Sequence, residues 1–295
     1  MEDIYKVKSI EKKNYKKYFF TEEQKNLVVK LYEEFGSSVD VGKKFNVGHK
    51  VIAKILEEKG IKRIAAKKRK YKINENYFDV IDTPNKAYIL GFLYADGCNN
   101  KSKGTISMSL EERDKYILED IRNEIDSGRP LEFIDYSNKH DLGYTYKNQY
   151  RLLLFSIHMC NILESHGVVP NKSLVLDFPN LRHDLLSHFV RGYFDGDGSV
   201  TQGKKKTNFI LTITSTNNFC EKLKEIIEKE VGINCHVYNA SNNNGITKVF
   251  TVSGRFQVKS LLDWLYKDAD LFLERKHDRY IQYFYNIDKN NTLVV

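Results

Sequence analysis

Two stretches of this chain share one pattern: residues 89–97 read ILGFLYADG, and residues 190–198 read VRGYFDGDG. Each is an apolar run that ends in an aspartate followed by a glycine. A Thr-Pro pair ahead of the first copy supplies an N-cap and a first helical residue. The closing glycines, Gly97 and Gly198, can adopt the left-handed conformation that ends many helices. Each copy is therefore predicted to be a helix whose last residue is an aspartate.

Small residues lie four positions apart within each copy, at Gly91 and Ala95 and at Gly192 and Gly196. This spacing places both small residues on one helix face and removes side-chain bulk there, so two backbones can approach closely. We expect the two helices to pack against each other near a local two-fold axis, with their final aspartates side by side at one end.

That end of the pair is unfavourable for acids. A helix C-terminus disfavours carboxylates, and two adjacent carboxylates repel each other. A divalent cation, Mg²⁺ or Mn²⁺, would relieve both effects; its predicted protein ligands are Asp96, Asp197 and the backbone carbonyls of Ala95 and Gly196. Such a metal could activate water and stabilise the leaving oxygen of a phosphodiester. A simple Asp-Gly turn is the alternative, and it would be preferred for one copy alone.

The two stretches resemble the motifs of the LAGLIDADG homing endonucleases, single-chain class. Residues 91–96 and 192–197 both keep the motif's first glycine and its final, metal-binding aspartate. Tyr94 departs from the motif, where an aspartate is usual, and Asp195 keeps it. Because the final acid is the catalytic one in this family, the departure leaves the chemistry in place but makes the halves unequal. The resemblance covers about residues 73–288.

The resemblance also implies a lysine near each acid. Lys172 and Lys276 match this lysine by their place in the repeat. Their role would be to stabilise charge on the reacting phosphate or to lower the pKa of the attacking water. A surface lysine that contacts phosphate or solvent is the alternative for each, and Arg275 could replace Lys276 in this assignment.

The composition is that of a soluble chain long enough for two or three domains. No apolar run reaches the length of a membrane span, and no secretory signal opens the chain. The four cysteines show no CxxC pairing, so neither a zinc site nor a disulfide framework is indicated. We therefore expect an intracellular, reducing compartment: the cytoplasm, or the organelle or nucleus that holds the target DNA.

The net charge of +8 is unevenly placed. Residues 1–72 hold 20 Lys or Arg against 10 Asp or Glu, whereas the rest of the chain holds 27 against 29. The N-terminal part is thus predicted to bind a polyanion such as a nucleic acid. If the remainder of the chain binds DNA, it must do so through the placement of its charges and not through their number.

Residues 1–61 are predicted to form a partly ordered leader followed by a small all-α helix-turn-helix domain. Helices are expected at about residues 22–35, 39–45 and 49–59. The outward side chains of the third helix are predicted to contact DNA in a major groove: His49, Lys50 and Lys54. The alternative is a plain three-helix bundle with a solvated basic face.

A basic linker follows at residues 62–72. It can track phosphates and hold the two modules on one duplex, or it can act as a flexible tether, and both roles are compatible. The linker residues predicted to contact DNA are Lys67, Lys68, Arg69 and Lys70.

Residues 73–180 and 181–295 are predicted to repeat one αββαββα unit. Strict alternation at residues 105–110, for example, indicates a strand with one buried face. The predicted fold class is therefore α+β: two pseudo-symmetric units whose sheets form a saddle over a major groove, preceded by the helix-turn-helix domain. The expected base contacts are Thr105, Ser107, Ser109, Thr212 and Thr214, with Lys204, Lys205 and Lys206 on phosphate. Ordinary solvent-facing strand residues are the alternative.

The leading functional prediction is a site-specific, Mg²⁺-dependent endonuclease that cuts both strands of a long, asymmetric DNA site. We expect a monomer with no membrane association and no obligate protein partner. Two alternatives remain open. One is a DNA-binding regulator that does not cleave, which Tyr94 modestly supports; the other is an intron RNA maturase, with RNA as a partner.

Overall fold

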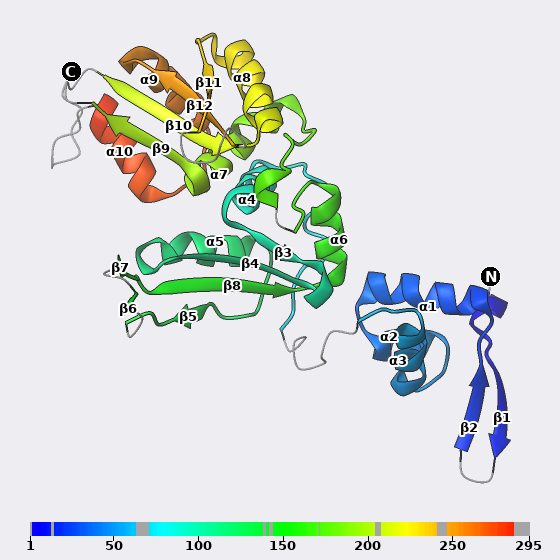
Figure 1. The fold of residues 1–295 in the computed structure, drawn as a ribbon. Helices are drawn as coiled ribbons and strands as arrows, with labels where there is room; N and C mark the ends of the chain where they lie inside the picture. The colour runs from blue at the N-terminus through cyan, green and yellow to red at the C-terminus, as the bar shows by residue number, and fades with distance from the viewer. Residues whose placement is uncertain are drawn as a thin grey trace.

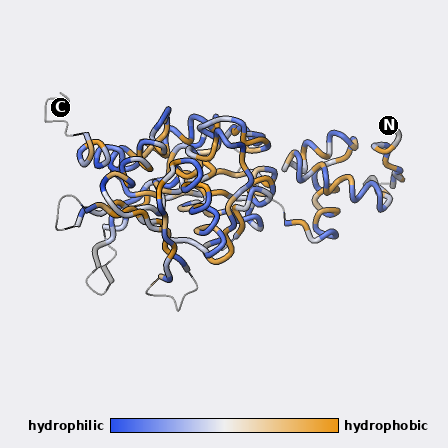
Figure 2. Tube along the Cα trace, turned by 90° about the horizontal axis from the view of Figure 1, so that it is seen from above, coloured by the Kyte–Doolittle hydropathy of each residue, from blue (hydrophilic) through white to orange (hydrophobic). Residues whose placement is uncertain are grey.

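The computed structural model describes residues 2–12, 15–62, 71–137, 140–141, 144–170, 172–203, 208–240 and 247–285 (Figure 1). The protein has an α+β fold of helices and antiparallel sheets, in which two sheet-containing halves lie on either side of a central helix pair. A smaller N-terminal unit lies to one side of them, and Figure 2 shows the same separation from above. Among the described residues, no helix combines the length and apolar character needed to cross a membrane.

The N-terminal unit contains the three predicted helices. They are α1 (Glu22–Phe35), α2 (Ser38–Lys44) and α3 (His49–Glu58). Thr21 caps α1 in a reciprocal capping box with Gln24, and Gly36 ends this helix in the left-handed conformation. Buried apolar residues of all three helices form a separate small core.

The three-helix domain agrees with the prediction, but the leader before it contains strands that the sequence analysis did not predict. A two-stranded antiparallel ribbon, β1 (Lys8–Lys12) and β2 (Tyr15–Phe19), precedes α1. The segment carries many lysines and lacks a clear apolar alternation, so its sequence gave no strand signal. Contacts at its base fix it instead: the Gln24 amide donates hydrogen bonds to the carbonyls of Ile4 and Lys6.

The first half has the predicted element order. It consists of α4 (Pro84–Asp96), β3 (Cys98–Asn100), β4 (Thr105–Glu111), α5 (Lys115–Glu124), β5 (Glu132–Ile134), β8 (Gln149–Phe155) and α6 (Ile157–Ser165). Its sheet has the order β3-β4-β8-β5. A short pair, β6 (His140–Asp141) and β7 (Tyr144–Thr145), lies between β5 and β8 in the chain.

The second half repeats this order. It consists of α7 (Leu186–Asp197), β9 (Gly198–Gln202), β10 (Phe209–Ser215), α8 (Asn217–Val231), β11 (His236–Asn239), β12 (Lys248–Ser253), α9 (Arg255–Tyr266) and α10 (Glu274–Phe284). Its sheet order, β9-β10-β12-β11, is equivalent to that of the first half. Thr201 lies within β9, where its backbone pairs with Ile210.

Side-chain alternation gives each sheet one buried face and one open face. In β4, Ile106, Met108 and Leu110 are buried, while the intervening residues are partly exposed. The buried faces and both motif helices contribute to one continuous core that spans the two halves. The open faces make up the surface that the sequence predicted as a saddle.

The N-terminal unit contacts the first half through α1 and α6. Ile157, at the start of α6, packs against the small core of the N-terminal unit. This contact is encoded by residues more than 120 positions apart in the chain, and the sequence did not reveal it.

Candidate active site

The two motif helices, α4 and α7, touch backbone to backbone. A Cβ atom on Gly91 would lie 2.0 Å from the Phe189 carbonyl oxygen, and one on Gly192 would lie 2.0 Å from the Tyr88 carbonyl oxygen. Real side chains do not approach a backbone so closely, so no residue larger than glycine fits. The predicted packing of the two small-residue faces is confirmed.

This packing brings the two final aspartates to the same end of the helix pair. A Cβ atom on Gly196 would lie 2.3 Å from the Ala95 Cβ and 3.2 Å from Asp96 Oδ2. The carboxylate that ends α4 therefore lies against the last turn of α7, one residue before Asp197. Both aspartate side chains reach solvent.

The conformation predicted for Gly97 and Gly198 was wrong. Their φ angles are −78° and −84°, with extended ψ angles, so neither residue is left-handed. Each helix passes directly into a strand, and this tight exit places the glycine against the preceding turn. A Cβ atom would lie 2.5 Å from the Leu93 carbonyl oxygen at Gly97 and 2.7 Å from the Phe194 carbonyl oxygen at Gly198. Space, and not backbone handedness, requires glycine at both positions.

The carboxylates are held in an environment that disfavours their charge. Loss of hydration against the surrounding protein, followed by the nearby charge of Asp197, raises the pKa of Asp96 to about 6. Loss of hydration also raises the pKa of Asp197. Charge repulsion was the effect expected from the sequence, but desolvation is the larger one. Lys172 and Lys276 oppose both shifts.

The structure brings both predicted lysines to the ends of the motif helices. Lys172 Nζ donates hydrogen bonds to the carbonyl oxygens of Ala95, at 3.0 Å, and Gly97, at 2.6 Å. Lys276 Nζ donates to the carbonyls of Phe194 and of Gly198, the latter at 2.6 Å. These bonds satisfy carbonyls that a helix end leaves unpaired. They also hold both positive charges close enough to the two aspartates to interact with each of them.

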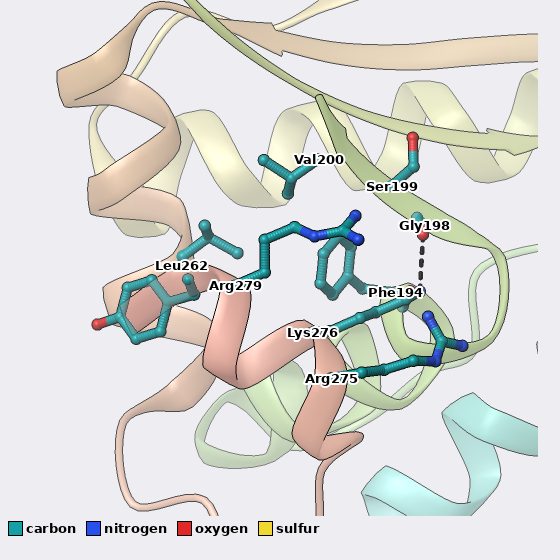
Figure 3. Close-up of a pocket in the computed structure, with 9 residues that line it drawn as sticks. Phe194, Gly198, Ser199, Val200, Leu262, Arg275, Lys276 and Arg279 are labelled. Carbon is teal, nitrogen blue, oxygen red and sulfur yellow. Dashed lines mark hydrogen bonds between the residues drawn. The ribbon is translucent and has the colours of Figure 1, made fainter. Parts of the chain in front are cut away.

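Lys276, and not Arg275, is the motif-contacting residue of the second half. Figure 3 shows Lys276 reaching toward Gly198, with the Arg275 side chain beside it. Arg275 Nε instead forms a 2.9 Å ion pair with Asp114 Oδ2 in the first half. The backbone N–H of Glu274 donates to the Tyr116 hydroxyl beside it. These contacts link the start of α10 to the other half, and their sequence separation of about 160 residues hides them from sequence reasoning.

Burial of Lys276 lowers its pKa to about 8. Burial also lowers the pKa of Lys172, while Asp197 and Asp96 oppose the shift. Each half thus offers an ammonium group whose proton is held less firmly than that of an exposed lysine. Both groups can stabilise negative charge, and the ammonium group of Lys276 can also exchange a proton near neutral pH.

The residue two positions before each final aspartate fixes the chain segment that carries the lysine. Asp195 is buried, and its Oδ2 accepts hydrogen bonds from the Leu273 backbone N–H, at 2.8 Å, and from the Tyr88 hydroxyl, at 2.9 Å. Tyr94, at the equivalent place, donates its hydroxyl to the His166 carbonyl, ahead of Lys172. The two halves therefore use the same position for the same anchoring role, with donor and acceptor exchanged.

This exchange predicts that an aspartate does not fit at position 94. Tyr94→Phe removes the hydrogen bond and leaves a partly buried carbonyl without this donor, so we expect the free energy of unfolding to fall by about 1–2 kcal/mol. Tyr94→Asp is expected to cost more than about 3 kcal/mol, because it also empties a buried ring site and points a second acceptor at the His166 carbonyl. Urea unfolding measures both changes. The exposed Tyr238→Phe is the control. A Tyr94→Asp protein as stable as the parent would contradict this account.

Asp195 should make the stability depend on pH. Its complete burial raises its pKa to about 6, from an ordinary 3.8. Because the folded state holds this proton more firmly, the cost of ionisation appears as the pH rises from about 4 to 6 and is complete above that range. Asp195→Asn keeps an accepting oxygen but cannot ionise. Relative to the parent, the variant should gain about 2 kcal/mol of unfolding free energy between pH 4 and pH 7. Parallel pH profiles for the two proteins would contradict the prediction.

The donor set at the paired aspartates fits a hydrated Mg²⁺ or Mn²⁺ ion. The described part of the chain contains no group of three His, Cys, Asp or Glu side chains that could hold a metal. Two carboxylates are nevertheless typical of Mg²⁺ sites, where water and phosphate oxygens complete the shell. Of the two carbonyls predicted as ligands, that of Ala95 accepts the Lys172 hydrogen bond in this structure. The Asp96 carboxylate forms no salt bridge within the described ranges.

The hydroxyl residues predicted to contact bases lie on the open sheet faces. Thr105, Ser107, Ser109 and Thr212 are half-buried, and Thr214 is exposed. Register places further side chains on the open face of the second sheet, which the sequence reasoning did not include: Ser199, Thr251, His236 and Tyr238. Alternation along residues 199–201 could have identified the first of these.

The two open faces differ in charge. The first carries ion pairs, among them Arg151 with Glu132 and Lys147 with Glu111. The described part of the second presents mainly hydroxyls, and Ser199 Oγ lies 2.9 Å from Thr212 Oγ1. A ligand that spans both faces would therefore meet two different surfaces.

The remaining candidates lie away from the paired aspartates. His49, Lys50 and Lys54 are exposed on α3 of the N-terminal unit. Seven predicted DNA-binding residues lie outside the described residues: Lys67, Lys68, Arg69, Lys70, Lys204, Lys205 and Lys206.

The second motif helix, with its strands and the helices that follow, has a counterpart among known protein families. Residues 184–262 match the model of the LAGLIDADG-like domain. This LAGLIDADG-like stretch includes Asp197 and ends before Lys276. An uncharacterized protein of Methanocaldococcus jannaschii is 27% identical over 168 residues, which are 53% of this chain. The chain spans 58% of the length of that relative.

Solved structures of similar shape share little sequence with this chain. The homing endonuclease I-WcaI, bound to its DNA recognition sequence, has a TM-score of 0.48 and 15% identity, covering 68% of this chain and 90% of that one. The meganuclease I-SmaMI, bound to uncleavable DNA, has a TM-score of 0.44 and 11% identity, covering 68% and 88%. Full-length WhiA from Thermatoga maritima has a TM-score of 0.44 and 15% identity, covering 71% and 64%. At such identities, the activity of this chain has to be inferred from its own residues.

Proposed function

We propose that this protein is a site-specific endonuclease of the LAGLIDADG homing type, which hydrolyses both strands of double-stranded DNA with a divalent metal. One observation carries the proposal. Two aspartates from two helices end at the same place, and each has a lysine bound to the end of its own helix. Two equivalent acid-lysine sets around a local two-fold axis suit a substrate with two antiparallel strands.

Asp96 and Asp197 would hold Mg²⁺ or Mn²⁺, which, when bound, activates water and stabilises the leaving oxygen of a phosphodiester. The raised pKa of Asp96 favours a neutral carboxyl below about pH 6, so the site gains metal-binding capacity above that pH. Lys172 and Lys276 present ammonium groups that stabilise the additional negative charge of the reacting phosphate. Their hydrogen bonds to the helix ends fix these charges in position.

DNA binding would use the open sheet faces of both halves together with α3 of the N-terminal unit. Hydroxyl groups on the sheets can contact base edges in a major groove, and the exposed cations of α3 can contact a second groove. The two sheet faces differ in charge, which suits an asymmetric target. We include in the proposal a monomer in a reducing compartment. The four cysteines are free thiols, which agrees with a reducing compartment.

The proposal is tested with purified full-length protein and a randomised duplex library. The library is incubated with Mg²⁺ or with EDTA, and bound molecules and cut ends are sequenced. We expect Mg²⁺-dependent cuts on both strands of one asymmetric motif. Specific binding without cutting would replace the endonuclease by a regulator on the same fold, and a preference for structured RNA would replace it by a maturase.

The contact made by Tyr94 supports the endonuclease over the non-cleaving regulator. Its hydroxyl anchors the segment that leads to Lys172, as Asp195 anchors the segment that leads to Lys276. The departure from the usual motif residue thus has a structural explanation within the first half. It leaves Asp96 in place at the end of α4.

A further inference from the structure

The ribbon of β1 and β2 has no role in the site described above, yet its surface composition is unusual. Residues 8–19 contain five lysines and one glutamate. Ile10 is 55% exposed and Phe19 is 43% exposed, although both are large apolar residues. Isolated two-stranded hairpins are marginally stable in water. A ribbon with exposed basic and apolar side chains would therefore be stabilised by a binding partner that covers them.

One face of the ribbon carries these features together. The antiparallel register pairs Lys8 with Phe19 and Ile10 with Lys17, and paired residues point to the same side. Lys17 Nζ lies 5.1 Å from the centre of the Phe19 ring, within the range of a cation–π contact. Glu11 lies at a register position of the opposite face. The described part of this face, called here the basic ribbon face (Lys8, Ile10, Lys17 and Phe19), thus contains two cations and no acid.

The base of the ribbon is fixed to the helices of the N-terminal unit. The rings of Tyr5 and Phe20, on either side of the ribbon, both lie within 5.5 Å of the Phe45 ring in the small core. The Gln24 amide holds the carbonyls of Ile4 and Lys6 at 2.9 and 3.1 Å. The strands beyond this base project from the unit (Figure 1). Their position relative to α3 is therefore set by the fold, which a flexible basic tail could not achieve.

We propose that the basic ribbon face is a second DNA-binding surface of the N-terminal unit, which lies on the same duplex as α3. The proposal rests on the DNA-binding part of the proposed function. The charge complements a phosphate backbone, and a major groove admits a two-stranded ribbon as well as a helix. Lys8 and Lys17 bind phosphates, while Ile10 and Phe19 contact the apolar edges of sugars and bases. The ribbon thereby extends the bound site beyond the groove that α3 occupies.

The test compares Lys8→Ala/Lys17→Ala with Lys30→Ala/Lys229→Ala in the full-length protein. The control removes the same charge from two exposed lysines outside the ribbon. Binding to the selected duplex is measured in EDTA from about 50 to 200 mM salt, and cleavage is measured separately in Mg²⁺. Loss of two phosphate contacts should reduce the slope of log affinity against log salt by about 2 and weaken binding about tenfold or more. The control pair should leave both values unchanged.

Hydroxyl-radical footprinting gives the position of the contact. The ribbon variant should lose protection at backbone positions flanking the α3 groove and keep it at the cleavage site. Equal slopes and footprints for the two double variants would overturn the ribbon proposal, even if the parent cuts DNA. A parent that binds DNA and shows the ribbon effect but never cuts would instead overturn the endonuclease alone. If the control pair lost as much affinity as the ribbon variant, the effect would come from the net charge of the protein, and the ribbon proposal would also be overturned.

Discussion

Asp197→Asn is expected to abolish double-strand cleavage while leaving folding and DNA binding intact. The Asp197 side chain reaches solvent at the end of α7, so asparagine fits without repacking. It removes one of the two carboxylates that would hold the metal and stabilise the reacting phosphate. Such interactions contribute several kcal/mol to a transition state, so cutting should slow by about a thousandfold or more. Cleavage of a supercoiled plasmid that carries the target, with separate quantification of nicked and linear products, measures the effect.

Asp96→Asn tests the equivalence of the two halves and should also prevent linear product. Asp184→Asn is the matched control, because this exposed aspartate lies in the second half and pairs with Arg182 away from the motif. Retained double-strand cleavage by Asp197→Asn would remove this acid from the mechanism. Loss of folding and binding together would make the acid structural.

Gly192→Ala is expected to produce the largest loss of stability of any single methyl addition considered. The new Cβ would lie 2.0 Å from the Tyr88 carbonyl oxygen and 2.9 Å from the Phe92 nitrogen. Both obstacles are backbone atoms of the facing helix, so no side-chain rotation can relieve the overlap. The helices would have to separate, which would also disturb the alignment of Asp96 and Asp197. We expect the free energy of unfolding to fall by at least about 3 kcal/mol.

Urea unfolding followed by circular dichroism measures this loss. Gly48→Ala is the control: a Cβ there would meet nothing within 4 Å, and its φ of −67° is accessible to alanine. The control should change stability by less than about 1 kcal/mol. A Gly192→Ala protein as stable as this control would show that the two helices are not packed as closely as described. Gly91→Ala should reproduce the loss, because its Cβ would meet the Phe189 carbonyl in the same way.

The sequence predicted correctly those elements that are determined by neighbouring residues, such as helix caps and strand alternation. Thr21 and Gly36 bound α1 because a side-chain cap and a left-handed glycine act within one turn of the helix. Strict alternation of apolar and polar residues located β4, because successive side chains of a strand point to opposite faces of the sheet. The repeat of nine residues indicated that one unit occurs twice, and the small-residue spacing indicated how the two copies meet.

Features that depend on distant partners were missed. The role of Tyr94 could not be read from the motif, because its partner is a backbone carbonyl 72 residues away. The hydrogen bonds of Lys172 and Lys276 to the helix ends are equally non-local, although the resemblance indicated that each lysine lies nearby. The ribbon of β1 and β2 was missed because its order comes from its base and not from its own pattern.

The sequence by itself determined that two glycine-lined helices would bring two aspartates together, since helical spacing fixes which residues share a face. Only the tertiary structure decided the environment of those acids. Burial, more than repulsion between the pair, raises the pKa of Asp96, because hydration is lost only when distant segments pack around the carboxyl group. The structure also decided that Gly97 and Gly198 are required by space and that Arg275 joins the two halves. Local pattern thus set the elements, and contacts between residues far apart in the chain set the chemistry of the site.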